Sequence, residues 1–271
     1  PGAAILAAKG ALKMGAGKLT AALPSAARAS FTAQLPEAMI MDTTDNEIGS
    51  VDADNIDKMS SFPADAWVIG PGLGRDEKTL QMIREFLPQL TVPAVLDADA
   101  LFAVCGYLRL LKKSNVPLVI TPHPGEMAKL LGVNISDVQS NRVTVAESFA
   151  KQTDVVVVLK GAGTVIATPE GRIFINNTGN PGMATGGSGD VLAGMIATLL
   201  AQGMVPAVAA ACAVWIHGKA GDIATSQSGI AGLLAGDIAA AVPAALNAIN
   251  ERHINDAAIP RFIFPASLLA I

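Results

Sequence analysis

Charged and aromatic residues are scarce in this sequence. Of its 271 residues, 15% are charged and 4% are aromatic, and the formal net charge is −4. A chain with so little excess positive charge has no broad electrostatic attraction to nucleic acid or to an anionic membrane. We therefore expect neither as a partner, and a local site would have to hold any anionic ligand.

Cysteines are scarce as well. Only Cys105 and Cys212 are present, far apart in the sequence. This number and spacing fit neither a disulfide framework nor a metal or redox motif. No basic segment precedes the apolar start, as a secretory signal would require. The sequence therefore predicts a cytoplasmic protein with two reduced thiols.

One long run lacks charge altogether. Residues 191–216 contain no charged side chain and exceed the roughly 20 residues that a helix needs to cross a bilayer. Gln202, Gly203 and Pro206 interrupt the run, and two Trp and one Tyr are too few for the aromatic belts of a membrane protein. We predict two buried helices joined by a turn, and no membrane span.

Short β-branched runs alternate with longer helical patterns in the middle of the chain. The predicted strands are 66–70, 92–99, 116–121, 155–160, 164–167 and 172–176, and the predicted helices are 77–90, 125–132 and 141–152. This order predicts a single α/β domain over residues 1–271, with a mostly parallel sheet covered by helices on both faces. The turn at 169–171 predicts an antiparallel hairpin at an edge. Residues 191 to about 250 are predicted to be helical.

Both ends of the chain are unusual for such a fold. Residues 1–20 open on a helical pattern and a glycine-containing turn, although a strand normally precedes the first helix of a doubly wound sheet. We expect this first strand to be missing or to come from elsewhere. Residues 250–271 are an extra tail. Its apolar part, 259–271, is either an added strand or subunit arm, or a terminal segment without function.

Six glycines gather in residues 177–194, directly before the apolar run. Unpaired amides and the helix dipole make a helix start a good phosphate site, and Gly186, Gly187 and Gly189 let the backbone turn its amides toward an anion. Asp190 lies in the first helical turn, where it could accept a hydroxyl proton during phosphoryl transfer. An ordinary helix start with an acidic first turn gives a similar pattern, and neither GxxxxGK[ST] nor GxGxxG occurs.

Six motifs occur in the order and spacing of one enzyme family. They are PGAAILAAKGALKMGAG (1–17), GPGLG (70–74), LDADAL (96–101), ITPHPGEMAKLLG (120–132), LKGAGT (159–164) and NTGNPGMATGGSGDVLAG (177–194). Over residues 1–250 the chain resembles the ADP/ATP-dependent NAD(P)H-hydrate dehydratases. The resemblance implies a ribokinase-like three-layer α/β/α sandwich. It also implies a lyase that restores NADH and NADPH from their hydrated (6S) forms by phosphorylating the added hydroxyl and eliminating phosphate, with ADP or ATP and Mg²⁺ as cofactors.

The resemblance also assigns site residues. Asp190 resembles the catalytic group that deprotonates the substrate hydroxyl, and no protein metal ligands are implied. The implied substrate-binding residues are Ala3, Gly72, Gly74, His123 and Asp190. The nucleotide-binding residues, including those of the glycine-rich turn, are Lys160, Gly161, Ala162, Gly163, Thr164, Gly186, Gly187, Ser188 and Gly189. The family precedent also implies a homotetramer.

Three further carboxylates have two interpretations each. Asp97 and Asp99 come after VPAVL (92–96), at the end of a predicted strand, and either act around a metal–phosphate complex or cap a loop. Glu126, beside His123, either helps to hold Mg²⁺ through water or caps its helix, and the cap is favoured.

The remaining polar candidates are weaker. Asn180, Thr185 and Ser188 are possible phosphate or ribose contacts by position only. His217 and His253 have no motif around them and are interpreted as structural or exposed.

Two other functions remain open at this point. One is a ribokinase-like kinase for a vitamin-precursor alcohol of the thiazole, pyridoxal or pyrimidine type, which would share the anion site and the acid but should lack the PGAA and HPGE elements. The other is a catalytically silent nucleotide-binding relative. The intact run of residues 186–190 argues against it, and the absent first strand argues for it.

Overall fold

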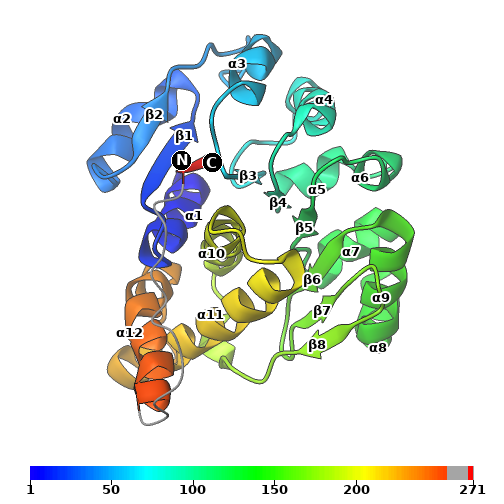
Figure 1. The fold of residues 1–271 in the computed structure, drawn as a ribbon. Helices are drawn as coiled ribbons and strands as arrows, with labels where there is room; N and C mark the ends of the chain where they lie inside the picture. Colours follow the sequence, from blue (N-terminus) through cyan, green and yellow to red (C-terminus); the bar gives the residue numbers. More distant parts are fainter. Residues whose placement is uncertain (255–267, 271) are drawn as a thin grey trace.

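The computed structural model describes residues 1–254 and 268–270. A nine-stranded sheet forms its centre, in the order β2-β1-β9-β3-β4-β5-β6-β7-β8 (Figure 1). Every pair from β2 to β6 is parallel, whereas β7 is antiparallel to β6 and β8 is antiparallel to β7. The strands are β1 (Lys18–Ala22), β2 (Met39–Met41), β3 (Ala66–Ile69), β4 (Ala94–Leu96), β5 (Leu118–Ile120), β6 (Val156–Leu159), β7 (Val165–Ala167), β8 (Ile173–Ile175) and β9 (Leu268–Ala270).

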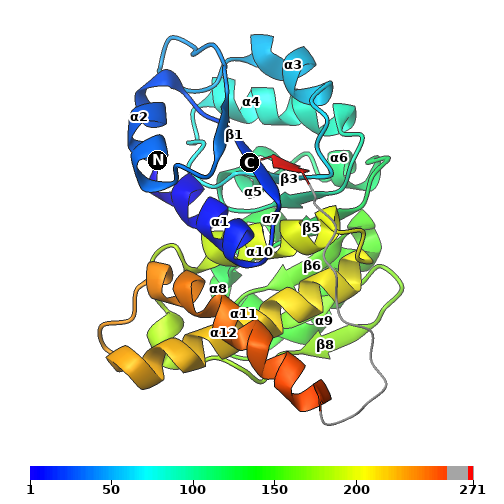
Figure 2. The same cartoon turned by 60° about the vertical axis from the view of Figure 1, so that its left-hand side comes forward.

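Helices cover both faces of this sheet (Figures 1 and 2). The α-helices are α1 (Gly2–Lys13), α2 (Ser25–Gln34), α3 (Ile56–Ser60), α4 (Glu77–Phe86), α5 (Asp99–Ala103), α6 (Arg109–Lys112), α7 (Pro124–Leu131), α8 (Ile135–Ser140), α9 (Arg142–Thr153), α10 (Ser188–Ala201), α11 (Pro206–Ser228) and α12 (Ala235–Ile254). Short 3-10 helices are η1 (Ala53–Asn55), η2 (Leu87–Gln89) and η3 (Pro181–Met183). The predicted three-layer α/β/α arrangement with a mostly parallel sheet is therefore confirmed.

Successive residues of the central strands alternate between two apolar cores, as the period of a strand requires. Val68 of β3 and Val119 of β5 pack in the core formed with α1, α10, α11 and α12. Trp67, Ile69 and Ile120, their neighbours along the chain, pack in the core of the opposite face, with α4, α7 and α9. The central strands are apolar on both sides because both sides are covered.

Helices α1 and α10 approach each other through glycine. A Cβ atom on Gly10 would lie 2.2 Å from the Val191 carbonyl oxygen, and one on Gly194 would lie 1.9 Å from that of Ala7. Thr198 also donates a hydrogen bond across the interface to the Ala11 carbonyl, at 3.2 Å. This close contact fixes the position of α10, whose amino end borders the site described below.

The long apolar run forms two helices, α10 and α11, joined by a turn at residues 202–205, as predicted. Together they supply much of the first core. No helix in residues 1–254 is long and apolar enough to span a bilayer.

The predicted edge hairpin is confirmed as β7 and β8, with β8 at the edge of the sheet. The predicted strand 92–99 is too long, because the extended segment ends at Leu96 and Asp99 already begins α5. The sequence analysis did not identify β1, α2 and β2. The helical pattern at the end of the chain continues to Ile254.

The two unusual ends of the chain meet in the sheet. β9 lies between β1 and β3 and runs parallel to both. Residues 268–270 of the predicted tail thus form a strand beside β1, whereas 255–267 and 271 lie outside the described residues. Whether the tail has a role in assembly or activity stays a prediction.

Candidate active site

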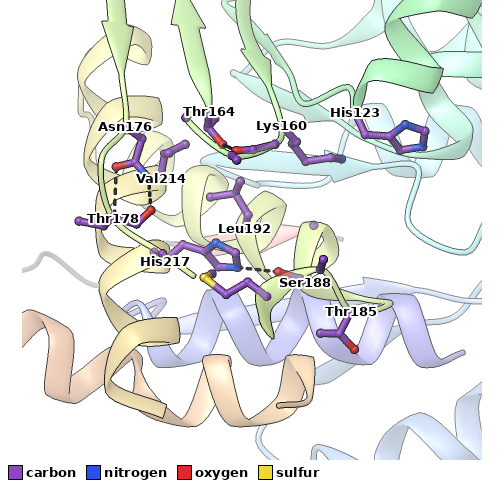
Figure 3. Close-up of a pocket in the computed structure, with 18 of the residues that line it drawn as sticks. His123, Lys160, Thr164, Asn176, Thr178, Thr185, Ser188, Leu192, Val214 and His217 are labelled. Atoms are coloured by element: carbon purple, nitrogen blue, oxygen red, sulfur yellow. Dashed lines mark hydrogen bonds between the residues drawn. The ribbon is translucent and has the colours of Figure 1, made fainter. Parts of the chain in front are cut away.

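A cavity of about 740 Å³ lies at the carboxyl ends of β4, β5 and β6, bordered by the amino end of α10. Ligands of parallel sheets gather at such strand ends. Figure 3 shows His123, Lys160 and Thr164 along one side of the cavity and Thr185, Ser188 and His217 along the other. Ten of the predicted site residues line it: His123, Lys160, Gly161, Ala162, Gly163, Thr164, Gly187, Ser188, Gly189 and Asp190. Gly186 is not among the lining residues but adjoins Gly187.

The amino end of α10 is open toward this cavity. Gly187 is the N-cap residue, at a left-handed φ of 89°, and the helix has no side-chain cap. A Cβ atom at this position would also lie 2.2 Å from Leu6 Cδ1, so the backbone conformation favours glycine and a larger residue would displace the end of the Leu6 side chain. The amides of Gly189 and Asp190 donate to no backbone acceptor in residues 1–254. Such unpaired donors suit an anion, and the anion site expected from the glycine-rich stretch stays a prediction.

Lys160 follows β6 and stands among carboxylates. Its Nζ lies 2.7 Å from Asp97 Oδ1 and 3.7 Å from Glu126 Oε2. Burial acts to lower the pKa of Lys160, but attraction to these two carboxylates outweighs it, and the pKa is raised. A Cβ atom on Gly189 would lie 3.1 Å from Lys160 Nζ. The ammonium group is therefore charged and sits beside the open amides of α10.

Asp190 faces the same cavity from the first turn of α10. Burial, with a further contribution from the charge of Asp97, raises the pKa of Asp190 to about 7, and Lys160 opposes the shift. A carboxylate with a pKa near the working pH is well matched to accepting a proton from an alcohol.

The amino end of α7 is closed by its own side chains. His123 Nδ1 accepts hydrogen bonds from the amides of Gly125 and Glu126, at 3.0 and 3.3 Å. Glu126 Oε2 accepts one from the His123 amide, at 2.7 Å. This capping box confirms the favoured interpretation of Glu126. The ring of His123 is exposed, and its Nε2 lies 3.5 Å from Glu126 Oε1.

Asp97 and Asp99 do not act as a pair. Asp97 is buried against Lys160 and lines the cavity. Asp99 accepts hydrogen bonds from the Gly74 amide at 2.9 Å and from Arg75 Nε at 2.7 Å. The loop-capping interpretation is therefore right for Asp99.

One of the other predicted substrate residues, Gly72, lies at a second hollow. This apolar cavity of about 270 Å³ is lined by Gly72, among residues of β1, β3 and the start of α1. Gly72 has a φ of 75°, and a Cβ atom there would lie 3.4 Å from Ala3 Cβ. Ala3 and Gly74 line neither cavity. The structure thus brings His123 and Asp190 together, but not Ala3, Gly72 and Gly74 with them.

The wall formed by residues 176–185 is fastened to α11. Asn180 Nδ2 donates to Asp222 Oδ1 at 3.0 Å, and the Gly179 amide donates to Asp222 Oδ2 at 3.1 Å. Asn180 and Thr185 both line the cavity. The carboxamide of Asn180 is thus already engaged in holding the wall.

A family model described as NAD(P)H-hydrate dehydratase matches residues 1–244. The chain belongs to this family. It is 46% identical over 252 residues to the bifunctional NAD(P)H-hydrate repair enzyme Nnr of Moorella thermoacetica, covering 92% of this chain and 48% of that protein. It is 42% identical over 250 residues to the ADP-dependent (S)-NAD(P)H-hydrate dehydratase of Neisseria meningitidis, covering 89% and 79%. The chain spans about half the length of the bifunctional relatives that it matches.

Solved structures agree with this membership. The ADP/ATP-dependent NAD(P)H-hydrate dehydratase of Bacillus subtilis, co-crystallized with ATP and Mg²⁺, is 33% identical and superposes with a TM-score of 0.78, covering 92% of this chain and 87% of that one. Solved ribokinase-like proteins share the arrangement. The ribokinase-like fold implied by the motifs is therefore confirmed.

One residue that lines the cavity was interpreted from the sequence as structural or exposed. His217, on α11, is buried, lines the cavity, and lies with Nε2 3.4 Å from Ser188 Oγ (Figure 3). Burial lowers the pKa of His217 to about 4, so the ring is neutral near pH 7. No local pattern marks it, because its partner is 29 residues away. The side chain of His253 lies outside the described residues.

No cluster of three or more His, Cys, Asp or Glu side chains in the described residues has the geometry of a metal site. The carboxylates that line the cavity are Asp97, Glu126 and Asp190, and the first two are engaged by Lys160. The polar groups of the cavity therefore fit an anionic ligand best.

Proposed function

We propose that this chain dehydrates the (6S) hydrates of NADH and NADPH with ADP or ATP, as a metabolite-repair enzyme. The observation that carries the proposal is the juxtaposition of open amides, Lys160 and Asp190 in one cavity. Membership in the family and the names of its characterised members support the substrate class. The ATP and Mg²⁺ of the Bacillus subtilis relative support the nucleotide.

The residues of the cavity divide the proposed reaction between them. Asp190 takes the proton of the added hydroxyl as its oxygen attacks the terminal phosphorus of the nucleotide, and the shortened nucleotide leaves. The amides at the start of α10 and the ammonium of Lys160 stabilise the negative charge on the moving group. Phosphate then leaves the ring, a ring proton is lost, and the double bond is restored.

The predicted nucleotide contacts fall on two sides of the phosphates in this scheme. Residues 160–164 contribute a strand end and a glycine turn, and residues 186–189 contribute the helix start. His123 is the proposed substrate contact within the same cavity. Ala3, Gly72 and Gly74 would contact a more distant part of the dinucleotide, because Gly72 lines the second hollow, Ala3 adjoins Gly72, and none of the three lines the first cavity.

Mg²⁺ is part of this proposal as the companion of the nucleotide. Asp97 and Glu126 are the carboxylates that would face it through water, because both line the cavity, and Glu126 would keep its helix cap. The ion supplies positive charge to the phosphate oxygens when bound. We also propose a homotetramer in the cytoplasm, and light scattering of the purified protein tests the assembly.

The proposal is tested by incubating the folded protein with hydrated NADH, Mg²⁺ and either ADP or ATP. Recovery of the absorbance of reduced nicotinamide is expected with at least one nucleotide, together with release of phosphate. Failure of both nucleotides would reject the dehydratase function. Phosphorylation of a thiazole, pyridoxal or pyrimidine alcohol in parallel assays would support a kinase instead.

A further inference from the structure

Arg142 occupies an unfavourable position for a cation. It is the first residue of α9, a 12-residue helix whose first turn contains no acidic residue. The partial positive charge of a helix amino end repels a guanidinium there. Arg142 makes no ion pair within residues 1–254. Burial without an ion pair also lowers the pKa of Arg142. Some other interaction must therefore hold this side chain in place.

Backbone carbonyls of the turn between β6 and β7 supply that interaction. Arg142 Nη2 donates to the carbonyl oxygens of Leu159 at 3.0 Å and Gly163 at 3.4 Å, and Nη1 donates to that of Lys160 at 3.3 Å. The guanidinium also lies directly against the turn, because a Cβ atom on Gly161 would be 2.8 Å from Nη1. A planar fork of donors suits several carbonyls at once, which a lysine could not match.

These bonds decide which way the turn presents its polar groups. The carbonyls of residues 159, 160 and 163 are drawn toward Arg142. The amides of Gly161, Ala162 and Gly163 donate to no backbone acceptor in residues 1–254, and the same three residues line the cavity. Positive φ angles of 146° at Gly161 and 64° at Gly163 allow this arrangement. Successive unpaired amides in such a turn form an anion-binding concavity.

We propose that Arg142 is a positioning residue for the nucleotide, which turns the amides of residues 161–163 toward its phosphates by holding the carbonyls of the turn. The proposal rests on the proposed function, since the ligand is the nucleotide of that site. Arg142 does not touch the reacting atoms. Its effect therefore belongs to nucleotide affinity and not to the handling of the hydrated dinucleotide.

The test compares Arg142→Met, Arg142→Lys and a matched control, Arg109→Met. Arg109 is an exposed residue at the start of α6, a helix that packs on α9. Calorimetry with ADP and with ATP, each with Mg²⁺, gives nucleotide Kd without requiring turnover. We expect Arg142→Met to raise Kd and the nucleotide KM about tenfold, since charge-assisted hydrogen bonds are lost. Arg142→Lys should recover part of the loss, and Arg109→Met should bind as the wild type does.

The KM for hydrated NADH should stay within about twofold of the wild type in every variant, because its proposed contacts are elsewhere. A merely structural role would instead lower the melting temperature and raise both KM values together, and that result overturns the proposal. So does an unchanged nucleotide Kd in folded Arg142→Met.

Gly161→Ala gives an independent check, because its methyl group would displace the guanidinium. It should weaken nucleotide binding, and combining it with Arg142→Met should add little further loss. Full additivity contradicts the proposed contact. Wild-type protein that binds ADP without dehydrating the substrate would overturn the proposed function alone, and the Kd comparison would still decide the role of Arg142.

Discussion

Two helix amino ends border the cavity, and they are built in opposite ways. At α7, the ring of His123 and the carboxylate of Glu126 satisfy the backbone donors within the helix's own first turn. At α10, Gly187 brings no side chain, and the amides of Gly189 and Asp190 are left without backbone acceptors in the described residues. The first-turn donors of α7 are thus satisfied within the helix, whereas those of α10 are left open toward the cavity.

The comparison also separates the acids at these two ends. Glu126 is tied to a backbone amide and to Lys160. Asp190 has no such hydrogen bond, and burial raises its pKa to about 7. An acid with a structural partner stabilises its helix, whereas an acid without one is available for proton transfer. Each prediction below changes one side of this contrast.

The largest effect is expected from Asp190→Asn. Loss of a general base typically slows a reaction by about 10²–10⁴-fold, so kcat should fall by that order while nucleotide Kd stays within about threefold. Asp57→Asn changes an exposed carboxylate in the first turn of α3; it is the control and should retain wild-type kcat. Retained turnover in Asp190→Asn would remove this residue from the mechanism.

The same substitution should make the protein more stable above neutral pH. The pKa of Asp190 is about 7 in the folded chain and 3.8 as the ordinary value, so the folded state binds more protons between pH 4 and 7. Stability contributed by the protonated group is therefore lost as pH rises through this window. Thermal melting at pH 5 and 8 should show Asp190→Asn gaining stability over the wild type at both values, with the larger gain at pH 8, because pH 5 lies near the start of this window. Equal differences at both values would contradict the raised pKa.

Asp97→Asn should change the pH dependence of catalysis by a smaller amount. The substitution removes the negative charge of Asp97, which raises the pKa of Asp190. It also frees Lys160 from its ion pair with Asp97, and the charge of Lys160 lowers the pKa of Asp190. The acidic limb of the kcat profile should move to lower pH, and kcat at neutral pH should fall roughly tenfold as the base weakens. Asp99→Asn is the matched control, since that carboxylate holds Gly74 and Arg75 and should move the limb less.

Adjacent glycines at the open end should respond differently to alanine. Gly187→Ala places a side chain at a left-handed φ, which costs about 1–2 kcal/mol, and against Leu6. A Cβ atom on Gly186 meets nothing within 4 Å, so Gly186→Ala should cost only a few tenths of a kcal/mol. The free energies of unfolding of the two variants, measured in urea, test this difference. Equal losses would mean that the turn does not require the left-handed residue.

Local sequence patterns predicted the order of strands and helices in the middle of the chain and many of the residues that line the cavity. The glycine-rich turn, the capping box at His123 and the edge hairpin are each encoded within a few neighbouring residues, and all three are present in the structure. Asp97 and Lys160 were recognised at strand ends, but their ion pair spans 63 residues along the chain. Only the parallel register of β4, β5 and β6 brings them together.

The residues that the sequence analysis missed depend on tertiary contacts. His217 lies mid-helix in an apolar pattern, and Arg142 reads as an ordinary exposed residue at a helix start. No residue near either one in the sequence indicates its contact partner. His217 contacts Ser188 and Arg142 contacts the turn at 159–163, and both partners lie on other elements. The strand β9 is similar, since its place beside β1 depends on pairing between opposite ends of the chain.

The smallest expected effect lies at the closed end, at Glu126. Glu126→Ala removes both the cap and the charge, and should lower the free energy of unfolding by about 1 kcal/mol. Glu126→Gln keeps an oxygen that can accept from the His123 amide, so it should lose less stability. It still removes the charge beside Lys160. Urea unfolding of the two variants therefore measures the cap by their difference. If both lose the same stability, the charge and not the hydrogen bond closes this end of α7, and the contrast with α10 would rest on electrostatics alone.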